Sequence, residues 1–436
     1  PIFAVSASGG TPRAVSTIDT QAGEVAHFYP MFLPDNRRFV FVARNLDPEK
    51  TSINLASIDG KEVRRLFPAD SAPIYAEPGY LLFARDASLF ARKFDGRSAK
   101  LAGDPIPAFE NVFYATEDNR LGASATEKRL AYVSWPPNRK LVWIDRKGRE
   151  LGTLGDVGAY ADVRISPDGR RVAVTKRDPS RGQNMDVWVL DAVRGTGSRI
   201  TTERTDEFNP AWFPDGERLL YVSDHVGFYD LYERPAAGGP EKVLVRSKTD
   251  KVLPSVAPDG RHVLFALSEG AGFVRALAPV SGGGELGRLT ANASGTEEHP
   301  VFSPDGQWTA FESAESGEPE IYIEALSGGS RRQVSIGGGQ AALWSRDGKE
   351  LFYVARDGML TSIPLGRAGG QLEAGEPQAL FPLRAGGRGG DIQSFRNIYD
   401  VSADGQKFLV IRRVTDSEPD GAVVVTNWTQ ALSRNR

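Results

Sequence analysis

Apolar residues fall along this chain in short runs, and each run is bounded by Gly, Pro, Asp or Asn. The clearest pair spans 209–213 and 218–222, with the sequences Asn-Pro-Ala-Trp-Phe and Arg-Leu-Leu-Tyr-Val. Runs this short, rich in β-branched and aromatic residues, are typical of strands rather than helices. A third run follows at 320–323 in a later copy, and a fourth at 331–334. Four strands in each unit of roughly 45 residues predict a propeller blade.

A four-residue phrase, Ser-Pro-Asp-Gly or a close variant, separates the first two strands of each unit. Full copies end at Gly169, Gly216, Gly260 and Gly306, and weaker copies occupy 33–36, 345–348 and 402–405. Pro presets the backbone of a tight turn, Asp bonds nearby amides, and Gly tolerates the exit geometry. We therefore expect hairpin turns, with positive or otherwise permissive φ at Gly216, Gly260 and Gly306. A metal-binding role for the Asp is the less favoured alternative.

The number of units decides the architecture. Complete units open near residues 25, 71, 121, 160, 207, 251, 298 and 340. The N-terminal runs 2–5 and 13–16 resemble the end of a unit, and the runs 398–401, 408–411 and 422–426 resemble the start of one. We expect an all-β propeller of four-stranded blades in a single domain, 1–436. Eight complete repeats and a composite blade from the two termini would give eight or nine blades, closed without free sheet edges. The alternative is a six-bladed ring over 159–436 and a partial second propeller over 1–158.

Composition narrows the class of protein. The chain has 436 residues, 40% of them hydrophobic and 25% charged, and its formal net charge is −3. No strong positive field favours nucleic acid, and no apolar run approaches the length of a membrane span. Without Cys, disulfides, zinc–thiolate sites and thiol nucleophiles are excluded. The chain opens within a strand and without a signal peptide, so we expect it to come from a longer precursor.

Motifs for catalysis are missing from the sequence. It contains no G-x-S-x-G nucleophile elbow, no H-E-x-x-H, no P-loop and no EF-hand loop. The letters at 282–287 fit G-x-G-x-x-G, but they follow a strand and open no helix, which favours a hairpin turn. We therefore expect a chain with no catalytic residue, no cofactor and no metal.

The four histidines allow two interpretations. His27, His225 and His299 fall on loops or strand starts at one end of their units, whereas His262 follows a turn at the head of a strand. Three histidines on one face could bind a metal together with carboxylates. The favoured alternative is that they are dispersed around a wide ring. A His–carboxylate group within about 5 Å would favour a metal-assisted lyase or hydrolase.

Polar residues concentrate where each unit begins, on the face opposite the Pro-Asp-Gly turns. Binding residues are common on loops held by a rigid scaffold, and ligand sites are concave. We expect this mouth of the central channel to bind a polar small molecule or a peptide or protein, and not nucleic acid. Its mixed charge is also typical of a solvated rim. The predicted ligand-binding residues are His27, Tyr29, Asp162, Glu207, Asn209, Lys251, Glu298 and His299.

The segment 205–216, Thr-Asp-Glu-Phe-Asn-Pro-Ala-Trp-Phe-Pro-Asp-Gly, resembles the repeat of TolB-type, WD40-like propellers, and similar repeats extend over nearly the whole chain. The order of the segments 5–12, 30–35, 141–148 and 423–428 looks like the C-terminal sensor region of certain bacterial serine/threonine kinases. That resemblance implies a kinase domain and a membrane span upstream, neither of which is in this chain. It also implies a periplasmic or extracytoplasmic, non-catalytic sensor. Oligogalacturonate lyases share the fold and use His with a metal, but no motif of theirs falls on these histidines. A TolB-like scaffold in an envelope complex is a further alternative.

Overall fold

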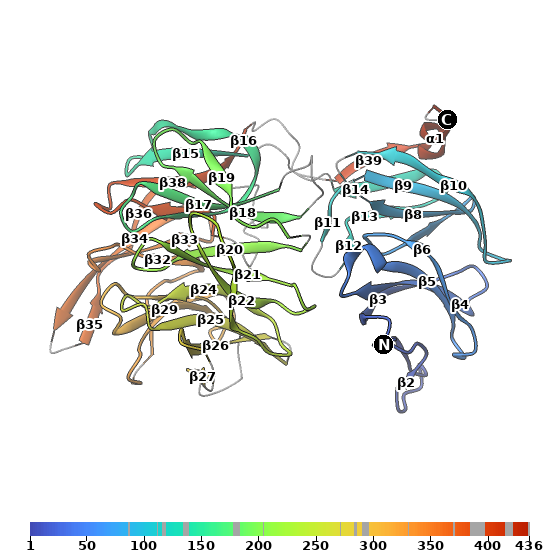
Figure 1. Ribbon diagram of the computed structural model, residues 1–436, viewed down its shortest axis with the longest axis horizontal. Coiled ribbons are helices and arrows are strands. Elements are labelled where there is room, and N and C mark those ends of the chain that lie inside the picture. Colours follow the sequence, from blue (N-terminus) through green and yellow to red (C-terminus); the bar gives the residue numbers. More distant parts are fainter. Residues whose placement is uncertain are drawn as a thin grey trace. The chain divides into compact units, whose positions relative to one another are not determined.

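Antiparallel strands make up nearly all of the regular structure in the computed structural model of this protein (Figure 1). The structure describes residues 1–85, 88–110, 112–115, 119–133, 139–177, 184–203, 205–270, 272–282, 286–289, 296–329, 331–368, 371–383, 397–414 and 422–434. By their contacts these residues divide into two compact units, whereas the sequence led us to expect one domain over 1–436. Unit 1 comprises 1–137 and 419–436, and unit 2 comprises 138–418.

Unit 1 contains two four-stranded sheets and several smaller ones. One four-stranded sheet has the order β3 (Glu24–Phe32), β4 (Arg38–Asn45), β5 (Ser52–Ser57) and β6 (Val63–Pro68). The other has the order β10 (Lys100–Phe109), β9 (Ser88–Asp95), β8 (Tyr80–Arg85) and β7 (Ile74–Ala76). A three-stranded sheet contains β13 (Ala123–Ala125), β14 (Arg129–Val133) and β39 (Ala422–Thr426). The remaining elements are the pair β1 (Phe3–Ala4) and β2 (Arg13–Ala14), the pair β11 (Tyr114–Ala115) and β12 (Arg120–Leu121), and the short helices η1 (Pro48–Lys50), η2 (Trp428–Gln430) and α1 (Ala431–Arg434).

Unit 2 is built from groups of four paired strands. The first group contains the second half of β16 (Glu150–Ile165), β17 (Arg171–Arg177), β18 (Met185–Asp191) and β19 (Gly197–Arg199). The second contains β20 (Glu207–Trp212), β21 (Arg218–Ser223), β22 (Asp230–Pro235) and β23 (Lys242–Val245). The third contains β24 (Lys251–Val256), β25 (His262–Glu269), β26 (Gly272–Pro279) and β27 (Gly287–Arg288). The fourth contains β28 (Glu297–Phe302), β29 (Trp308–Ser313), β30 (Glu320–Ala325) and β31 (Arg332–Gln333). The fifth contains β32 (Gly339–Trp344), β33 (Glu350–Ala355), β34 (Met359–Ala368) and β36 (Gln378–Pro382), and β35 (Gln371–Ala374) pairs with the far end of β34. The sixth contains β37 (Tyr399–Val401), β38 (Lys407–Arg413), β15 (Arg139–Asp145) and the first half of β16.

Strand β16 serves two of these groups. It pairs with β15 through residues 150–158 and with β17 through residues 159–165. Strand β38 then pairs with β15 over seven residues, from Lys407 opposite Asp145 to Arg413 opposite Arg139. The sixth group therefore joins strands that lie far apart in the sequence, and it links the two ends of unit 2.

Hydrogen bonds join neighbouring groups of strands around a closed cycle. The β16–β20 and β20–β24 contacts both pass through Asn209, which binds Asp162 and accepts the Leu253 amide. The following two contacts run from the Phe302 amide to Ser255 and from the Ala341 amide to Glu312. The last two contacts run from the Tyr399 hydroxyl to the Ala341 carbonyl at 2.7 Å and from the Ile165 amide to Asp400 at 2.6 Å. Four-stranded groups in such a cycle are consistent with propeller blades. The blade count of the whole chain stays a prediction.

The composite blade expected from the two termini is wrong. Strands β1 and β2 pair with each other over two residues, and β37 and β38 pair with β15 instead. The physical reason is the better ladder that β15 offers, because Leu141, Val142 and Ile144 are fully buried there. The last expected strand, 422–426, lies in unit 1, where it pairs with β14. The strand groups of unit 2 resemble the alternative that we stated, a ring over the C-terminal units. They differ from it in that unit 2 also includes β15, which precedes residue 159.

The turn prediction is confirmed. Gly216, Gly260 and Gly306 have φ values of 70°, 68° and 69°. In the best copy, Asp215 Oδ1 accepts the amides of Glu217 at 2.8 Å and Arg218 at 3.2 Å, so its carboxylate is used within the turn. The Gly216 amide closes the turn on the Phe213 carbonyl at 2.9 Å.

Central strands of the blades are buried on both faces because each blade packs against its neighbours. On β21, Leu219, Leu220, Tyr221 and Val222 are all fully buried, which explains the continuous apolar run. Outer strands such as β27 and β31 are two residues long and exposed. Among the described residues, no helix has the length and apolar character that crossing a membrane requires.

Candidate functional site

The eight predicted ligand-binding residues divide between the two units. His27 and Tyr29 lie on β3 of unit 1, and the other six lie on the innermost strands of unit 2. His27 is buried, with Nδ1 2.8 Å from Ser16 Oγ and Nε2 3.0 Å from Glu24 Oε2. Burial lowers its pKa, against the opposing effect of Glu24. His27 is therefore held by Ser16 and by Glu24 of its own strand.

In unit 2, Asp162 and Asn209 form the best-connected part of the predicted site. Both side chains are fully buried. Asp162 Oδ1 accepts Asn209 Nδ2 at 3.0 Å and the Asn397 amide at 2.8 Å, and Oδ2 accepts the Asn209 amide at 3.2 Å. Asn209 Oδ1 accepts the amide of Leu253 at 3.1 Å. These polar groups join the sixth, first, second and third groups around the channel, since Asn397 lies just before β37.

Asn209 occupies a position that recurs around both units. The residue five places before the turn Pro (before Arg346 in the last case) has positive φ at Tyr29, Asn209, Leu253, His299 and Ala341, with values from 47° to 54°. At each of these positions the register with the second strand shifts, which is the sign of a β-bulge. The bulge turns one residue of each first strand out of the ladder, so that its backbone can bond the next blade.

Lys251 and Glu207 are buried rather than displayed on a rim. Lys251 Nζ lies 2.6 Å from Asp230 Oδ1, and both side chains are fully buried. Burial lowers the pKa of Lys251, although Asp230 opposes this shift. Glu207 Oε1 accepts hydroxyls from Thr205 at 2.7 Å and Ser223 at 2.9 Å, and burial raises the pKa of Glu207 to about 7. Neither charge is available to a ligand in this conformation.

Glu298 and His299 meet a third residue that the sequence did not single out. His299 Nδ1 lies 2.8 Å from Glu312 Oε1, which also accepts the Ala341 amide at 2.6 Å. Burial, followed by the Glu312 charge, raises the pKa of Glu298 to about 7. Burial opposes protonation of His299, but Glu312 and Glu298 outweigh it and raise its pKa. This group lies on the channel wall.

The three histidines of the metal hypothesis do not form one group. Among the described residues, ligand atoms within 4.8 Å of one another occur in Glu203–His225–Glu241 and in Glu298–His299–Glu312. Each group contains a single His, and His27 belongs to unit 1. The dispersed arrangement is therefore the one that the structure shows.

The channel of unit 2 is narrow in the middle and wider on the side of the Pro-Asp-Gly turns. A small cavity of about 20 Å³ lies between Arg164, His299 and Tyr399. A vestibule of about 330 Å³ lies beside the turn prolines Pro167, Pro258 and Pro304. Its other lining residues include Arg164, Trp212, Val256, Trp344, Arg346 and Asp400. The vestibule is thus on the side opposite the mouth that the sequence favoured.

Sequence reasoning missed the vestibule, although one signal for it was present. Arg346 stands where most copies of the turn phrase have Pro. Its guanidinium donates to the carbonyls of Ser166 at 2.9 Å and Pro167 at 3.1 Å, on the turn of another blade. Across the cavity wall, Arg164 donates to the Tyr399 carbonyl at 3.2 Å. The two guanidiniums and the carboxyl of Asp400 give the vestibule a positive excess.

Comparisons with known proteins place these repeats in a family. The family model described as PD40, TolB beta propeller domain, matches residues 122–278 and 253–372, which together exceed half of the chain. The Tol-Pal system protein TolB of Bordetella pertussis is 34% identical over 149 residues, which are 34% of this chain and 34% of that protein. The uncharacterized peptidase YuxL of Bacillus subtilis is 27% identical over 51% of this chain and 33% of its own length. The chain thus spans about a third of these two curated relatives. The structure of TolB from Acinetobacter baumannii matches with a TM-score of 0.40 and 15% identity, covering 80% of this chain and 82% of that one.

Proposed function

The chain belongs to the family of TolB β-propeller domains, and from that premise we propose that it is a non-catalytic binding module. Its ligand is a polar small molecule or a segment of a peptide or protein, held in the channel of unit 2. The observation that carries this proposal is the vestibule of about 330 Å³ beside the Pro-Asp-Gly turns. A cavity walled by successive blades is where a ring of repeats presents several side chains to one object.

The chemistry of the vestibule favours an acidic group on the ligand. Arg164 and Arg346 are the cations of its wall, and Asp400 is the acid. Burial raises the pKa of Asp400, against the effect of Arg164, so its negative charge is disfavoured there. Trp212 and Trp344 add apolar surface to the same wall. A carboxylate on a short peptide segment or a small molecule fits this combination of charge and apolar surface.

The finer proposal is that the chain is the sensor region of a receptor-type serine/threonine kinase, outside the cytoplasm. It rests on the sequence segments 5–12, 30–35, 141–148 and 423–428 alone. None of the relatives named above is a kinase, and one belongs to the Tol-Pal system, which supports a scaffold in an envelope complex as the alternative. The gene sequence upstream of Pro1 separates these two: a kinase domain followed by a membrane span supports the sensor.

A metal-assisted lyase or hydrolase is the second candidate, and one observation favours it. Glu298, His299 and Glu312 bring their ligand atoms within 4.8 Å of one another on the channel wall. The adjoining cavity of about 20 Å³ holds little more than a water molecule, so a substrate would have to open the channel. For this reason binding without catalysis is the preferred function.

The test is to select ligands from a peptide library on the intact chain and then to compare variants. Val256→Arg places a long side chain in the vestibule from β24, and we expect its bulk to abolish or sharply weaken binding of the selected peptides, although its charge would attract an acidic group. Val243→Arg makes the same change at an exposed position on β23 and serves as the matched control. Far-UV circular dichroism and melting curves establish that both variants fold.

A second set of variants tests the opposite mouth. Alanine at Glu207, Glu298 and His299 removes the side chains that the sequence favoured. Binding that survives in Val256→Arg but fails in these variants would move the ligand to that mouth. The proposal is supported if the library selects acidic peptides and if Val256→Arg no longer binds them.

A further inference from the structure

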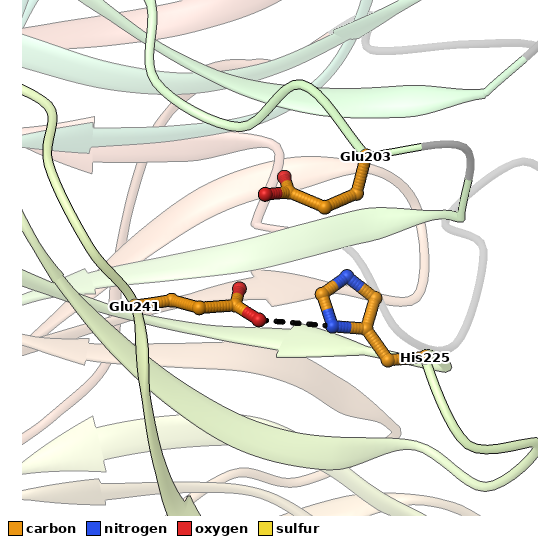
Figure 2. A group of neighbouring side chains, drawn as sticks. All are labelled: Glu203, His225 and Glu241. Atoms are coloured by element: carbon orange, nitrogen blue, oxygen red, sulfur yellow. Dashed lines mark ion pairs between the residues drawn. The ribbon is translucent and has the colours of Figure 1, made fainter.

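A His–carboxylate group lies on the flank of the second blade of unit 2, away from the channel. Glu203 belongs to the loop between β19 and β20, His225 to the loop between β21 and β22, and Glu241 directly precedes β23. Their ligand atoms lie within 4.8 Å of one another, and Figure 2 shows the two carboxylates and the imidazole turned toward one another. None of the three residues lines the channel cavities described above. The group therefore needs an explanation of its own.

Both nitrogens of the His225 ring face carboxylates. Nδ1 lies 3.1 Å from Glu241 Oε1, and Nε2 lies 3.4 Å from Glu207 Oε1. The ring packs edge-on against Tyr232, with centroids 4.9 Å apart, which fixes its orientation. A metal-binding His characteristically donates its second ring N–H to a carboxylate, and Glu207 stands where that acceptor is needed.

Glu207 supplies an independent sign that something is missing from this group. Its side chain is fully buried, yet Oε2 has no hydrogen-bond partner among the residues that the structure describes. Within the same described part of the chain, His225 Nε2 makes no hydrogen bond of good geometry either. A buried carboxylate is costly unless strong hydrogen bonds stabilise its charge. Binding of a cation at Nδ1 would polarise the Nε2–H toward Glu207.

The charge balance also leaves room for a cation. Glu203 and Glu241 share one permanently charged side chain, Arg234, which donates Nη2 to Glu203 Oε1 at 2.6 Å and to Glu241 Oε2 at 3.3 Å. Arg234 also donates Nη1 to the Ile200 carbonyl at 2.7 Å, so it is anchored to one side of the group. Glu241 Oε1, the oxygen near His225, is not the one that Arg234 binds.

We propose that Glu203, His225 and Glu241 bind a divalent metal ion of the zinc class, with Glu207 as the hydrogen-bond acceptor that orients the imidazole. One imidazole nitrogen and two carboxylate oxygens are donors that Zn²⁺ accepts, and a water molecule completes four ligands. Tetrahedral bonds of about 2.0–2.2 Å place donor atoms roughly 3.4 Å apart, so the side chains close in on the ion by about an ångström. The ion ties together the loop that joins two blades, the β21–β22 loop and the start of β23.

The experiment uses the intact chain, freed of metal with a chelator, and titrates it with ZnCl₂ by calorimetry at pH 7.5. Co²⁺ is titrated in parallel, because its visible absorption reports the ligands directly. We expect saturable binding of one equivalent. His225→Ala and Glu241→Gln should each weaken binding at least tenfold, and His262→Ala, at an exposed position on β25, should leave it unchanged.

His299→Gln separates this site from the other His–carboxylate group, in the channel. Zinc binding that persists in His299→Gln and is lost in His225→Ala supports the proposal. Binding that is lost in His299→Gln but kept in His225→Ala would overturn it, as would the absence of saturable binding to the unaltered chain. Melting curves without metal check the fold of each variant, and the near-isosteric Glu203→Gln and Glu241→Gln carry the test if His225→Ala is unstable.

Discussion

In each unit, a strand from the C-terminal part of the chain pairs with a strand from much earlier in the sequence, but the two C-terminal strands are buried to different extents. In unit 2, β38 pairs with β15 over seven residues, and Phe408, Leu409 and Val410 are fully buried. In unit 1, β39 pairs with β14, and its exposure alternates, with Val424 62% exposed. Strand β38 is interior to its sheet, whereas β39 is the last strand in the order β13–β14–β39. The C-terminal strand therefore lies in the core of unit 2 but at the edge of a sheet in unit 1.

This difference predicts that the same substitution has very different effects at the two closures. Val410→Asp buries an unpaired charge between β37 and β15, and we expect it to cost on the order of 4 kcal/mol or more in the free energy of unfolding. Val424→Asp places the same charge in solvent and should change the stability by no more than about 0.5 kcal/mol. Urea unfolding followed by circular dichroism measures both. Equal effects at the two positions would refute the contrast.

A second substitution tests whether the C-terminal segment supports unit 1 alone. Trp428 is fully buried among residues of unit 1, and its Nε1 donates to the Thr126 carbonyl at 2.9 Å. Trp428→Ala should cost about 3–5 kcal/mol, because it removes a large buried side chain. Hydrogen exchange read by mass spectrometry should show faster exchange in peptides from 1–133 and unchanged exchange in 139–177. Faster exchange in both regions would mean that the units unfold together.

Local features of the fold could be predicted from the sequence because their causes are local. The turns need only Pro, Asp and Gly in order, and the positive φ of Gly216, Gly260 and Gly306 follows from those residues. Strand pairing at closure could not be predicted in this way. The apolar runs at 2–5 and 141–144 look alike as patterns, and only the length of the ladder that each offers to 407–413 distinguishes them.

The candidate site shows the same division. We expected Asp162, Asn209, Glu298 and His299 at the mouth of the channel, on the segments that open their units, and the structure places them within the first strands of those units. The burial of Asp162, Asn209 and His299 was not predicted, because polar residues at the start of a unit suggest an exposed rim. In a ring these strands are innermost, where neighbouring blades crowd together, and so Lys251 and Asp230 end as a buried pair. Asp230 lies 21 residues from Lys251 in the sequence, beyond the reach of a local pattern.

Turns on the vestibule side offer a smaller test, of backbone geometry alone. A Cβ at Gly216 would meet nothing closer than 3.6 Å, so any cost of Gly216→Val comes from its φ of 70°. We expect a loss of about 1–3 kcal/mol. Gly366→Val on β34, where a Cβ meets no atom within 4 Å and φ is ordinary, should be close to neutral. Thermal unfolding of both variants provides the comparison, and a neutral Gly216→Val would contradict the strain.

The smallest effect expected is a dependence on pH that originates in the channel of unit 2. Burial, aided by Glu312, raises the pKa of Glu298 to about 7, so the folded chain retains a proton that the unfolded chain loses near pH 4.5. Stability from this group is therefore full below about pH 4.5 and declines as the pH rises toward 7. The raised pKa of His299 acts in the same direction, since its charge is lost as the pH rises through that pKa.

Glu298→Gln keeps the neutral form at every pH, so it should match the unaltered chain at pH 5 and exceed its stability at pH 8. A gain on the order of 1 kcal/mol is expected, because solvent screens part of the shift. Glu376→Gln, at an exposed position, is the matched control. Melting temperatures from pH 5 to 8.5 that run parallel for all three chains would show that the Glu298 carboxyl does not titrate in this range.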